Sequence, residues 1–166
     1  VERAIAKHYD LTNIPTDVPH TARHFPLLLM MYGGLRVGEA VSITGADIAG
    51  STVRVTKSRT NQGVTKRTKG GAGNVVIPSW LAELLRGWEG TDILPHSYYR
   101  WLKRNYGINP HACRHYYATR LIRAGVNPEI VRRQLRHANL ETTLQVYAQV
   151  EASDIDDVIA NVFDVA

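Results

Sequence analysis

The stretch NPHACRHYYATRLIRAGVNPEIVRRQLR, residues 109–136, specifies two consecutive helices. Each begins with the dipeptide Asn-Pro. The Asn side chain accepts hydrogen bonds from free N–H groups at a helix N-terminus, and Pro suits the first helical position because an N–H there would lack a partner. Gly125 follows the first helix, as Gly commonly does at a helix end. We therefore predict helices over residues 110–124 and 128–135.

The rest of the chain carries similar signals. Apolar spacing and terminal Gly residues predict further helices, with Ser79 as the N-cap of the third, over residues 21–32, 35–43, 79–88, 96–106, 141–150 and 154–163. Two β-branched runs, 52–56 and 74–77, predict a hairpin with a long, mobile connection. The expected fold class is mainly α with a small antiparallel β-sheet (α+β).

The composition is that of one globular domain with a basic body and an acidic tail. Of the 166 residues, 44% are apolar, enough to fill a core, and the formal net charge is +5. Residues 151–166 contain five acidic residues and no basic one, so residues 1–150 carry a charge of +10. A domain this basic is suited to binding a polyanion.

Several protein classes are excluded by the same arithmetic. The single cysteine, Cys113, rules out an internal disulfide framework and a multi-cysteine zinc site. The longest apolar run, residues 25–32, is too short to cross a membrane and contains Pro26. Nothing at the N-terminus resembles a signal peptide, and because the chain begins at Val1 we expect it to be part of a longer protein.

The connection between the two predicted strands, residues 57–73, is basic and contains no acidic residue. A solvated basic loop is one interpretation. The other is a loop that folds over a phosphate backbone, which makes DNA-binding candidates of Lys57, Arg59, Lys66 and Arg67.

His111 and Arg114 lie three positions apart in the first turn of the helix over 110–124. They share a helix face at the end where free N–H groups and the helix dipole favour an anion, so a phosphate oxygen is the expected ligand. His115 lies four positions after His111, a spacing that also fits a zinc pair. The Glu of a metalloprotease motif is absent and no third ligand is evident, so we expect no metal.

Two motifs stand 75 positions apart, measured from Arg36 to His111. The first is YGGLRVGEA, residues 32–40. The second spans residues 111–150 and contains His-x-x-Arg, then Leu-Arg-His at 135–137, a Thr-Thr pair at 142–143 and finally Tyr147. The two motifs, in this order and with a basic hairpin between them, closely resemble those of the tyrosine recombinases, the phage integrase family.

The resemblance implies the family's DNA breaking-rejoining catalytic-domain fold and a set of residue roles. Arg36 and Arg114 would hold the oxygens of the reacting phosphate, since a planar guanidinium offers paired donors that Lys lacks. His111 and His137 would donate hydrogen bonds to the phosphate or transfer a proton. Tyr147 would be the nucleophile and would form a covalent 3′-phosphotyrosyl bond with DNA.

Three further assignments follow from the resemblance. A hairpin Lys would protonate the leaving 5′-oxygen: Lys69 fits the position before the second strand, with Lys66 and Lys57 as alternatives. Glu39 would support Arg36, the first catalytic Arg, which lies three positions earlier in the chain. Arg136 stands where the family has Gly, so we expect it either to perturb the turn or to contact a phosphate.

The function expected is therefore site-specific recombination, on a phage or other mobile element, without metal, ATP or another cofactor. Double-stranded DNA would be the substrate, and self-association on DNA, as a tetrameric synapse, would bring two sites together. The alternatives are type IB topoisomerase-like nicking and relaxation, or a catalytically silent DNA-binding module. We expect a cytoplasmic, DNA-associated protein.

The expected domain organisation has three parts. Residues 1–150 would form the catalytic domain, with about 20 residues of lead-in. Residues 151–166 would form an amphipathic acidic tail that contacts another protomer or, when the chain is alone, folds back on its own domain, because apolar residues recur there at helical spacing. A core-binding domain would precede the chain in the longer protein.

Overall fold

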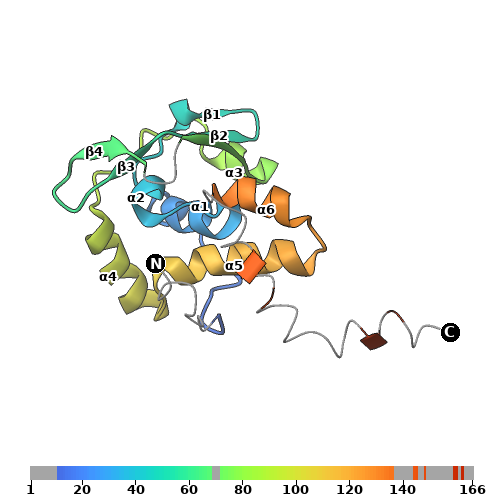
Figure 1. Ribbon diagram of the computed structural model, residues 1–166. Coiled ribbons are helices and arrows are strands. Elements are labelled where there is room, and N and C mark those ends of the chain that lie inside the picture. Colours follow the sequence, from blue (N-terminus) through green and yellow to red (C-terminus); the bar gives the residue numbers. More distant parts are fainter. Residues whose placement is uncertain are drawn as a thin grey trace.

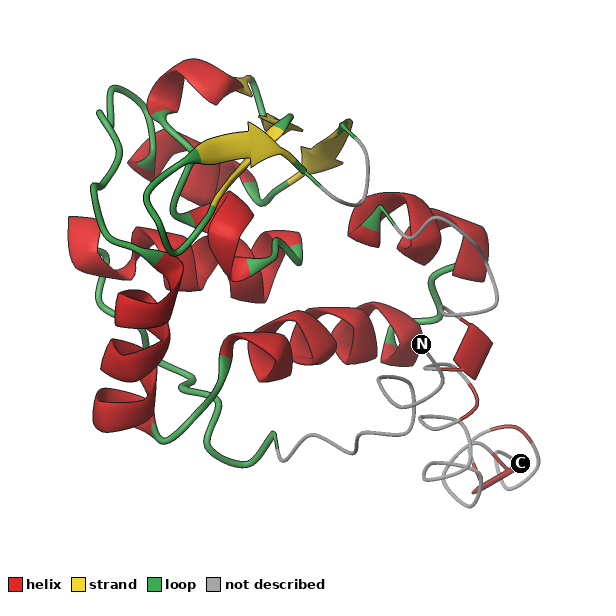
Figure 2. Cartoon of the chain, turned by 60° about the vertical axis from the view of Figure 1, so that its left-hand side comes forward, coloured by secondary structure: helices red, strands yellow, loops and turns green. Residues whose placement is uncertain are grey.

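A computed structural model describes residues 11–68 and 72–136, together with positions 144, 145, 148, 159, 160 and 162. Helices are the main regular structure of this part, and the strands gather at one end of it (Figures 1 and 2). The helices are η2 (Ala22–His24), α1 (Phe25–Gly33), α2 (Val37–Ala40), η3 (Gly45–Asp47), α3 (Ser79–Leu84), α4 (Pro95–Tyr106), α5 (Pro110–Arg123) and α6 (Pro128–Leu135). The strands are β1 (Ile48–Ala49), β2 (Thr52–Val55), β3 (Lys57–Arg59), β4 (Thr65–Arg67) and β5 (Gly73–Val76). The predicted α+β class is confirmed.

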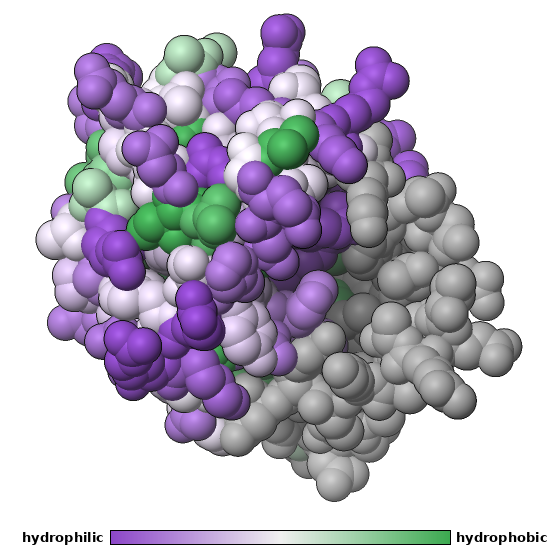
Figure 3. All heavy atoms as spheres, turned by 90° about the vertical axis from the view of Figure 1, so that its left-hand side faces the viewer, coloured by the Kyte–Doolittle hydropathy of each residue, from purple (hydrophilic) through white to green (hydrophobic). Residues whose placement is uncertain are grey.

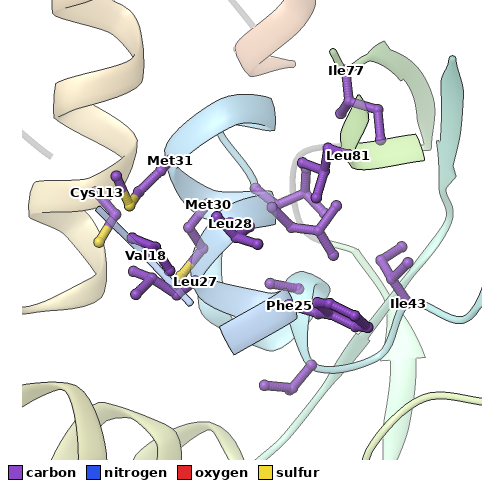
Figure 4. Packing of buried hydrophobic residues seen from close by; sticks show 14 of the residues in the cluster. Val18, Phe25, Leu27, Leu28, Met30, Met31, Ile43, Ile77, Leu81 and Cys113 are labelled. Atoms are coloured by element: carbon purple, nitrogen blue, oxygen red, sulfur yellow. The ribbon is translucent and has the colours of Figure 1, made fainter. Parts of the chain in front are cut away.

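Helix α1 lies at the centre of the hydrophobic core. Eight of its nine residues are buried, so this helix is apolar on every side, as expected for a helix enclosed by other elements. Its side chains meet Cys113 of α5 on one side and Ile77 and Leu81 on the other (Figure 4). Helix α1 ends at Gly34, whose φ of +69° is left-handed and whose absent side chain leaves room for the Tyr117 ring.

The strands confirm the predicted hairpin and add elements that the sequence did not reveal. β2 pairs antiparallel with β5, with Val53 opposite Val75, and β1 adds a third, two-residue strand on the other edge of β2. The connection between β2 and β5, which we predicted to be long and mobile, contains its own antiparallel hairpin of β3 and β4. These strands are three residues long and lack buried apolar positions, so they carry no period-two signal.

Polar contacts bind the β3–β4 hairpin to the segment after α2 and to the start of α4 and the residues before it. Ser42 Oγ donates to the carbonyl of Lys57 at 3.1 Å, and Arg59 Nη1 donates to the carbonyls of Thr91 and Ile93 at 2.6 and 2.9 Å. The backbone N–H of His96, in the first turn of α4, donates to Asn61 Oδ1 at 2.9 Å. The hairpin therefore has a defined position between α2 and α4.

The two Asn-Pro helix starts are confirmed. The Asn109 side chain accepts hydrogen bonds from His111 N and Ala112 N, and Asn127 does the same for Glu129 N. Ser79 is not the N-cap of α3: Pro78 occupies that position, and no side chain caps the helix. The predicted helices over 141–150 and 154–163 lie outside the continuously described residues.

Tyr98 connects α4 to the start of α1. Its ring is fully buried, its hydroxyl accepts a hydrogen bond from Leu27 N at 3.0 Å, and it donates one to the carbonyl of Arg23 at 2.9 Å. Leu27 is in the first turn of α1, where an N–H has no partner within the helix. Tyr98 therefore satisfies a buried donor that would otherwise be unpaired.

Replacing Tyr98 with Phe should lower the free energy of unfolding by about 1–3 kcal/mol, because the buried N–H of Leu27 loses its acceptor. Urea denaturation measures the change. The matched control is Tyr99→Phe, since Tyr99 is the next residue and is 41% exposed. Equal effects of the two substitutions would contradict this role for the Tyr98 hydroxyl.

Candidate active site

A cavity of about 450 Å³ lies where α2, the β3–β4 hairpin and the N-termini of α4 and α5 meet. Three of the predicted catalytic side chains, those of Arg36, His111 and Arg114, line it. Pro95 and Pro110, the first residues of α4 and α5, also line it, so both helix N-termini border the cavity. The fold thus brings together residues from both sequence motifs.

Arg114 is held deep in this site by two backbone carbonyls. Its Nη1 donates to the carbonyl of Gly34 at 3.0 Å and its Nη2 to that of Leu135 at 2.5 Å. These carbonyls belong to the ends of α1 and α6, so one guanidinium joins the C-termini of two helices. Cations are favourable at helix C-termini, which helps to offset the burial of this charge.

Burial lowers the pKa of Arg114, and the neighbouring charges of Arg36 and Arg136 lower that pKa further. The charge of Glu39 raises the pKa of Arg114, but it offsets only part of this lowering. The charged form of Arg114 is therefore held in an unfavourable environment. An anion in the cavity would relieve this cost.

Arg36 occupies the N-cap position of α2, with an extended backbone of φ −72° and ψ 154°. Its side chain is half-buried, and its Nη1 lies 3.8 Å from Glu39 Oε2. That Nη1 is buried and has no hydrogen-bond partner within the described part of the chain. This donor lies on the Glu39 side of the guanidinium, and the Arg36 side chain also lines the cavity, where it adds positive charge.

Glu39 is completely buried and accepts hydrogen bonds from three different segments. Arg136 binds it through two parallel contacts, Nη1 to Oε2 at 2.6 Å and Nη2 to Oε1 at 2.5 Å. The Arg36 N–H donates to Oε1 at 2.9 Å, and the Thr68 hydroxyl donates to Oε2. Burial alone would raise the pKa of Glu39, but the hydrogen bonds and charge of Arg136, assisted by those of Thr68 and Arg36, hold it below its usual value.

Arg136 differs from its predicted role. We expected it to contact a phosphate or to perturb the turn, yet its side chain is only 5% exposed and is directed to Glu39. The turn is kept, because Arg136 itself adopts the left-handed conformation, with φ 55° and ψ 37°, that Gly would adopt there. The prediction of a DNA contact through this guanidinium is corrected: its charge is used inside the protein.

The other predicted DNA-binding residues fall into two groups. Lys66 and Arg67 of β4 are exposed. Lys57 forms a half-exposed ion pair with Asp47 at 3.5 Å, and the donors of Arg59 are used on backbone carbonyls, so these two also hold the hairpin in place.

The remaining predicted residues have unequal coverage in the structure. His111 is exposed in the first turn of α5, at the cavity. Lys69, His137 and Tyr147 lie outside the described residues, although Thr68 and Arg136, the neighbours of the first two, are described.

The surroundings of the cavity are predominantly basic and polar. The face of the molecule that carries α4 and the β3–β4 hairpin is mostly hydrophilic, with a small apolar patch (Figure 3). Helix α4 contains no acidic residue and carries three exposed basic residues, Arg100, Lys103 and Arg104, of which the last two are in its final turn, at the opposite end from Pro95 at the cavity. Within the described ranges, no cluster of His, Cys, Asp and Glu could hold a metal ion, and no helix is long and apolar enough to cross a membrane.

Sequence reasoning missed the partners of Glu39. Arg36 and Glu39 are three residues apart, a spacing that suggests an ordinary surface pair, and their side chains do lie near each other. The stronger partner, Arg136, is 97 residues away in sequence. The available signal was the Arg at a position where a left-handed turn and the family pattern favour Gly.

Comparison with known proteins agrees with this geometry. Residues 93–154 match the model of the phage integrase family. This part of the chain therefore carries the sequence pattern of that family. The match covers α4, α5 and α6 as well as the positions of His137 and Tyr147.

Individual relatives extend the family likeness to most of the chain. The tyrosine recombinase XerC of Rhizobium meliloti is 30% identical over 150 residues, which is 80% of this chain and 47% of the relative. A Tn1549 transposon integrase in complex with circular intermediate DNA superposes with a TM-score of 0.64 at 18% identity, over 95% of this chain and 64% of that one. A XerA recombinase gives a TM-score of 0.62 at 18% identity, over 84% and 56%.

These structures show that the chain has the fold of a tyrosine recombinase catalytic domain. The chain spans about half or less of the length of the curated relatives it matches first.

An inorganic anion should bind in the cavity and stabilise the protein. At constant ionic strength, replacing chloride with about 100 mM phosphate should raise the melting temperature by about 5 °C, because a ligand that binds only the folded state stabilises it. Arg36→Gln should remove most of that rise, whereas Arg86→Gln should keep it, since Arg86 is exposed and paired with Glu83. An equal rise in all three proteins would place the anion elsewhere.

Proposed function

We propose that this chain is the catalytic part of a site-specific DNA recombinase that cleaves and rejoins strands through a covalent phosphotyrosyl intermediate. The observation that carries the proposal is the cavity in which Arg36, Arg114 and His111 meet. The positive charges of Arg36 and Arg114, the second of them unfavourably buried, both favour an anion there. A DNA phosphate supplies that anion.

The arginines have the geometry to stabilise the transition state of phosphoryl transfer. Attack on a phosphodiester creates a crowded phosphorus centre with additional negative charge on its oxygens. Donors that are already fixed stabilise such charge without reorganising, and Arg114 is fixed by the carbonyls of Gly34 and Leu135. Lys could not replace it, because a single ammonium cannot bind two carbonyls in this planar arrangement and still face a phosphate.

The proposed reaction conserves the energy of the phosphodiester bond. The Tyr147 oxygen attacks the phosphorus, and its proton passes to His111, His137 or water. The bond from phosphorus to the 5′-oxygen breaks, and Lys69 protonates that oxygen as it leaves. The 3′-phosphate is then esterified to Tyr147, and the 5′-hydroxyl of another strand can attack it and release the tyrosine. No ATP or metal is required in this sequence.

DNA would lie over the basic, hydrophilic face. Lys66 and Arg67 of β4 project from the hairpin next to the cavity, and both are exposed. Flexible exposed cations suit contacts to a phosphate backbone, which supply affinity without sequence specificity. The structural relative from Tn1549 was solved with DNA, which supports the same kind of partner here.

A nicked duplex that releases a short strand after cleavage should trap the intermediate. Because the target site is unknown, a library of nicked duplexes with randomised sequence serves as the probe, and a denaturing gel detects covalent protein–DNA adducts. The 166-residue chain should form adducts in the presence of a metal chelator, and Tyr147→Phe should form none. Arg114→Lys should reduce the rate by about 100-fold or more, as expected for loss of a transition-state donor.

Several outcomes would decide against this function. Adducts that persist in Tyr147→Phe, or that need a divalent metal, would contradict the tyrosine mechanism. Relaxation of supercoiled DNA without exchange between two sites would favour a type IB topoisomerase-like activity. Sequence-selective binding with no adduct would indicate a silent DNA-binding module.

We also propose that residues 151–166 contact a second protomer when the protein assembles on DNA. A groove of about 580 Å³ between α1, β5, α3, α5 and α6 would receive them. Trp80, Tyr117 and Leu121 line the groove, and Arg120 adds a positive charge suited to an acidic, amphipathic segment. A tetramer on two DNA sites would be built from such exchanges.

Removing residues 152–166 should abolish self-association on duplex DNA, measured by analytical ultracentrifugation, while the domain still folds. Trp80→Glu should have a similar effect, since Trp80 is 40% exposed in the groove. Glu83→Gln on the same helix serves as the control, because its side chain pairs with Arg86. Unchanged assembly after truncation would rule out the contact.

A further inference from the structure

The turn after α6 holds an unusual residue for its conformation. Arg136 has a φ of 55°, the only positive φ of a non-Gly residue in the described part of the chain. L side chains disfavour this region, and Gly, which the recombinase pattern has at this position, would adopt it without strain. The presence of Arg therefore requires a compensating interaction.

The Arg136 side chain extends into the protein interior and pairs there with Glu39. The aliphatic part of Arg136 passes over Gly73, where a Cβ atom would lie 3.1 Å from Cδ and 3.3 Å from Cγ. The guanidinium then meets Glu39 in a bidentate pair, with the Arg136 side chain 5% exposed and that of Glu39 fully buried. The small residue at position 73 makes room for the large one at position 136.

The carboxylate at the end of this reach connects three segments. Besides Arg136, Glu39 accepts hydrogen bonds from the backbone N–H of Arg36 and from the hydroxyl of Thr68. Each partner is a proposed catalytic residue or its direct neighbour. Arg36 lines the cavity, Thr68 directly precedes Lys69, and Arg136 directly precedes His137.

We propose that Arg136 is a positioning residue whose ion pair with Glu39 locks the three catalytic segments together. This inference rests on the proposed function and extends it. Arg136 does not line the cavity, so it acts on the reaction through the segments that the pair holds. With Gly at this position, the fully buried Glu39 would lose its bidentate partner, and the turn before His137 would lose its connection to α2 and to β4.

The rival explanation is that Arg136 is a local helix cap only. The backbone N–H of Arg136 does cap the C-terminus of α6, because it donates to the carbonyls of Arg132 and Arg133. A Gly at this position would keep both backbone hydrogen bonds. A local cap therefore predicts that Arg136→Gly is neutral or stabilising. The positioning role predicts the opposite sign, because a buried carboxylate without its cation is destabilising.

Hydrogen–deuterium exchange tests the coupling without any DNA. In Arg136→Gly, exchange should accelerate by about 10-fold or more at the turn and also in peptides that contain Arg36 and Thr68, since breaking a buried pair is costly. Arg133→Gly is the matched control: Arg133 lies in the same helix, and its side chain is 74% exposed. Faster exchange confined to the turn would overturn the proposal.

A second pair of variants covers the case in which Arg136→Gly does not fold. Arg136→Lys keeps the positive charge but lacks the planar fork, so it should show an intermediate acceleration at the same three segments. Glu39→Gln combined with Arg136→Gln removes both charges. The change in the free energy of exchange in this double variant should be smaller than the sum of the changes in the single variants Glu39→Gln and Arg136→Gln, and fully additive changes would contradict the coupling.

Adduct formation on the nicked-duplex library supplies the functional readout. Arg136→Lys should lower the cleavage rate at saturating DNA by about 10-fold and leave DNA affinity nearly unchanged, because the variant misplaces catalytic groups without removing phosphate contacts. A change in affinity alone would assign Arg136 to DNA binding and overturn the proposal. If the wild-type chain forms no adduct, the proposed function fails, and the exchange experiment alone decides the coupling.

Discussion

The hydrogen bonds and ion pair of the buried Glu39 carboxylate hold the segments of the site together. Three guanidiniums, those of Arg36, Arg114 and Arg136, interact with this carboxylate. The charges of Arg36 and Arg136 lower the pKa of Arg114, and the charge of Glu39 raises it. An ion pair this deep contributes little net stability, because both charges lose their hydration. Its value is geometric: a carboxylate has few ways to satisfy a bidentate guanidinium, a backbone N–H and a hydroxyl at once. The segments that supply these donors are thereby fixed relative to one another.

The same arrangement explains why the cavity favours an anion. Three permanent cations and one anion leave an excess of positive charge in a poorly hydrated place, and Arg136 is already committed to Glu39. The positive charge that Glu39 does not neutralise therefore belongs to Arg36 and Arg114, the two arginines that line the cavity. Arg114 cannot move to relieve the excess, because the ends of α1 and α6 hold it. A bound phosphate group would neutralise this excess charge. The transition state of phosphoryl transfer carries more negative charge on its oxygens, so the site would stabilise it more strongly than the ground state.

The sequence predicted those parts of the structure that depend on local chemistry. Asn109 and Asn127 cap their helices as expected, because capping involves residues two or three positions apart. The β3–β4 hairpin escaped prediction since polar contacts to other segments, such as those of Arg59, hold it rather than an apolar face. Among the site residues, the motifs placed Arg36, His111 and Arg114 together. They could not reveal that Arg136 turns inward, because its partner lies 97 positions earlier in the chain.

A crystal structure of the Tyr147→Phe chain with a captured duplex would show whether Arg36, Arg114 and His111 form the binding site for the reacting phosphate. We expect one DNA phosphate in the cavity with its oxygens about 3 Å from nitrogen atoms of both arginines, the distance of a charge-assisted hydrogen bond. We also expect the Arg136–Glu39 pair to stay intact in the complex. A duplex bound to α4 or the hairpin with every phosphate outside the cavity would show that these residues do not bind the reacting phosphate.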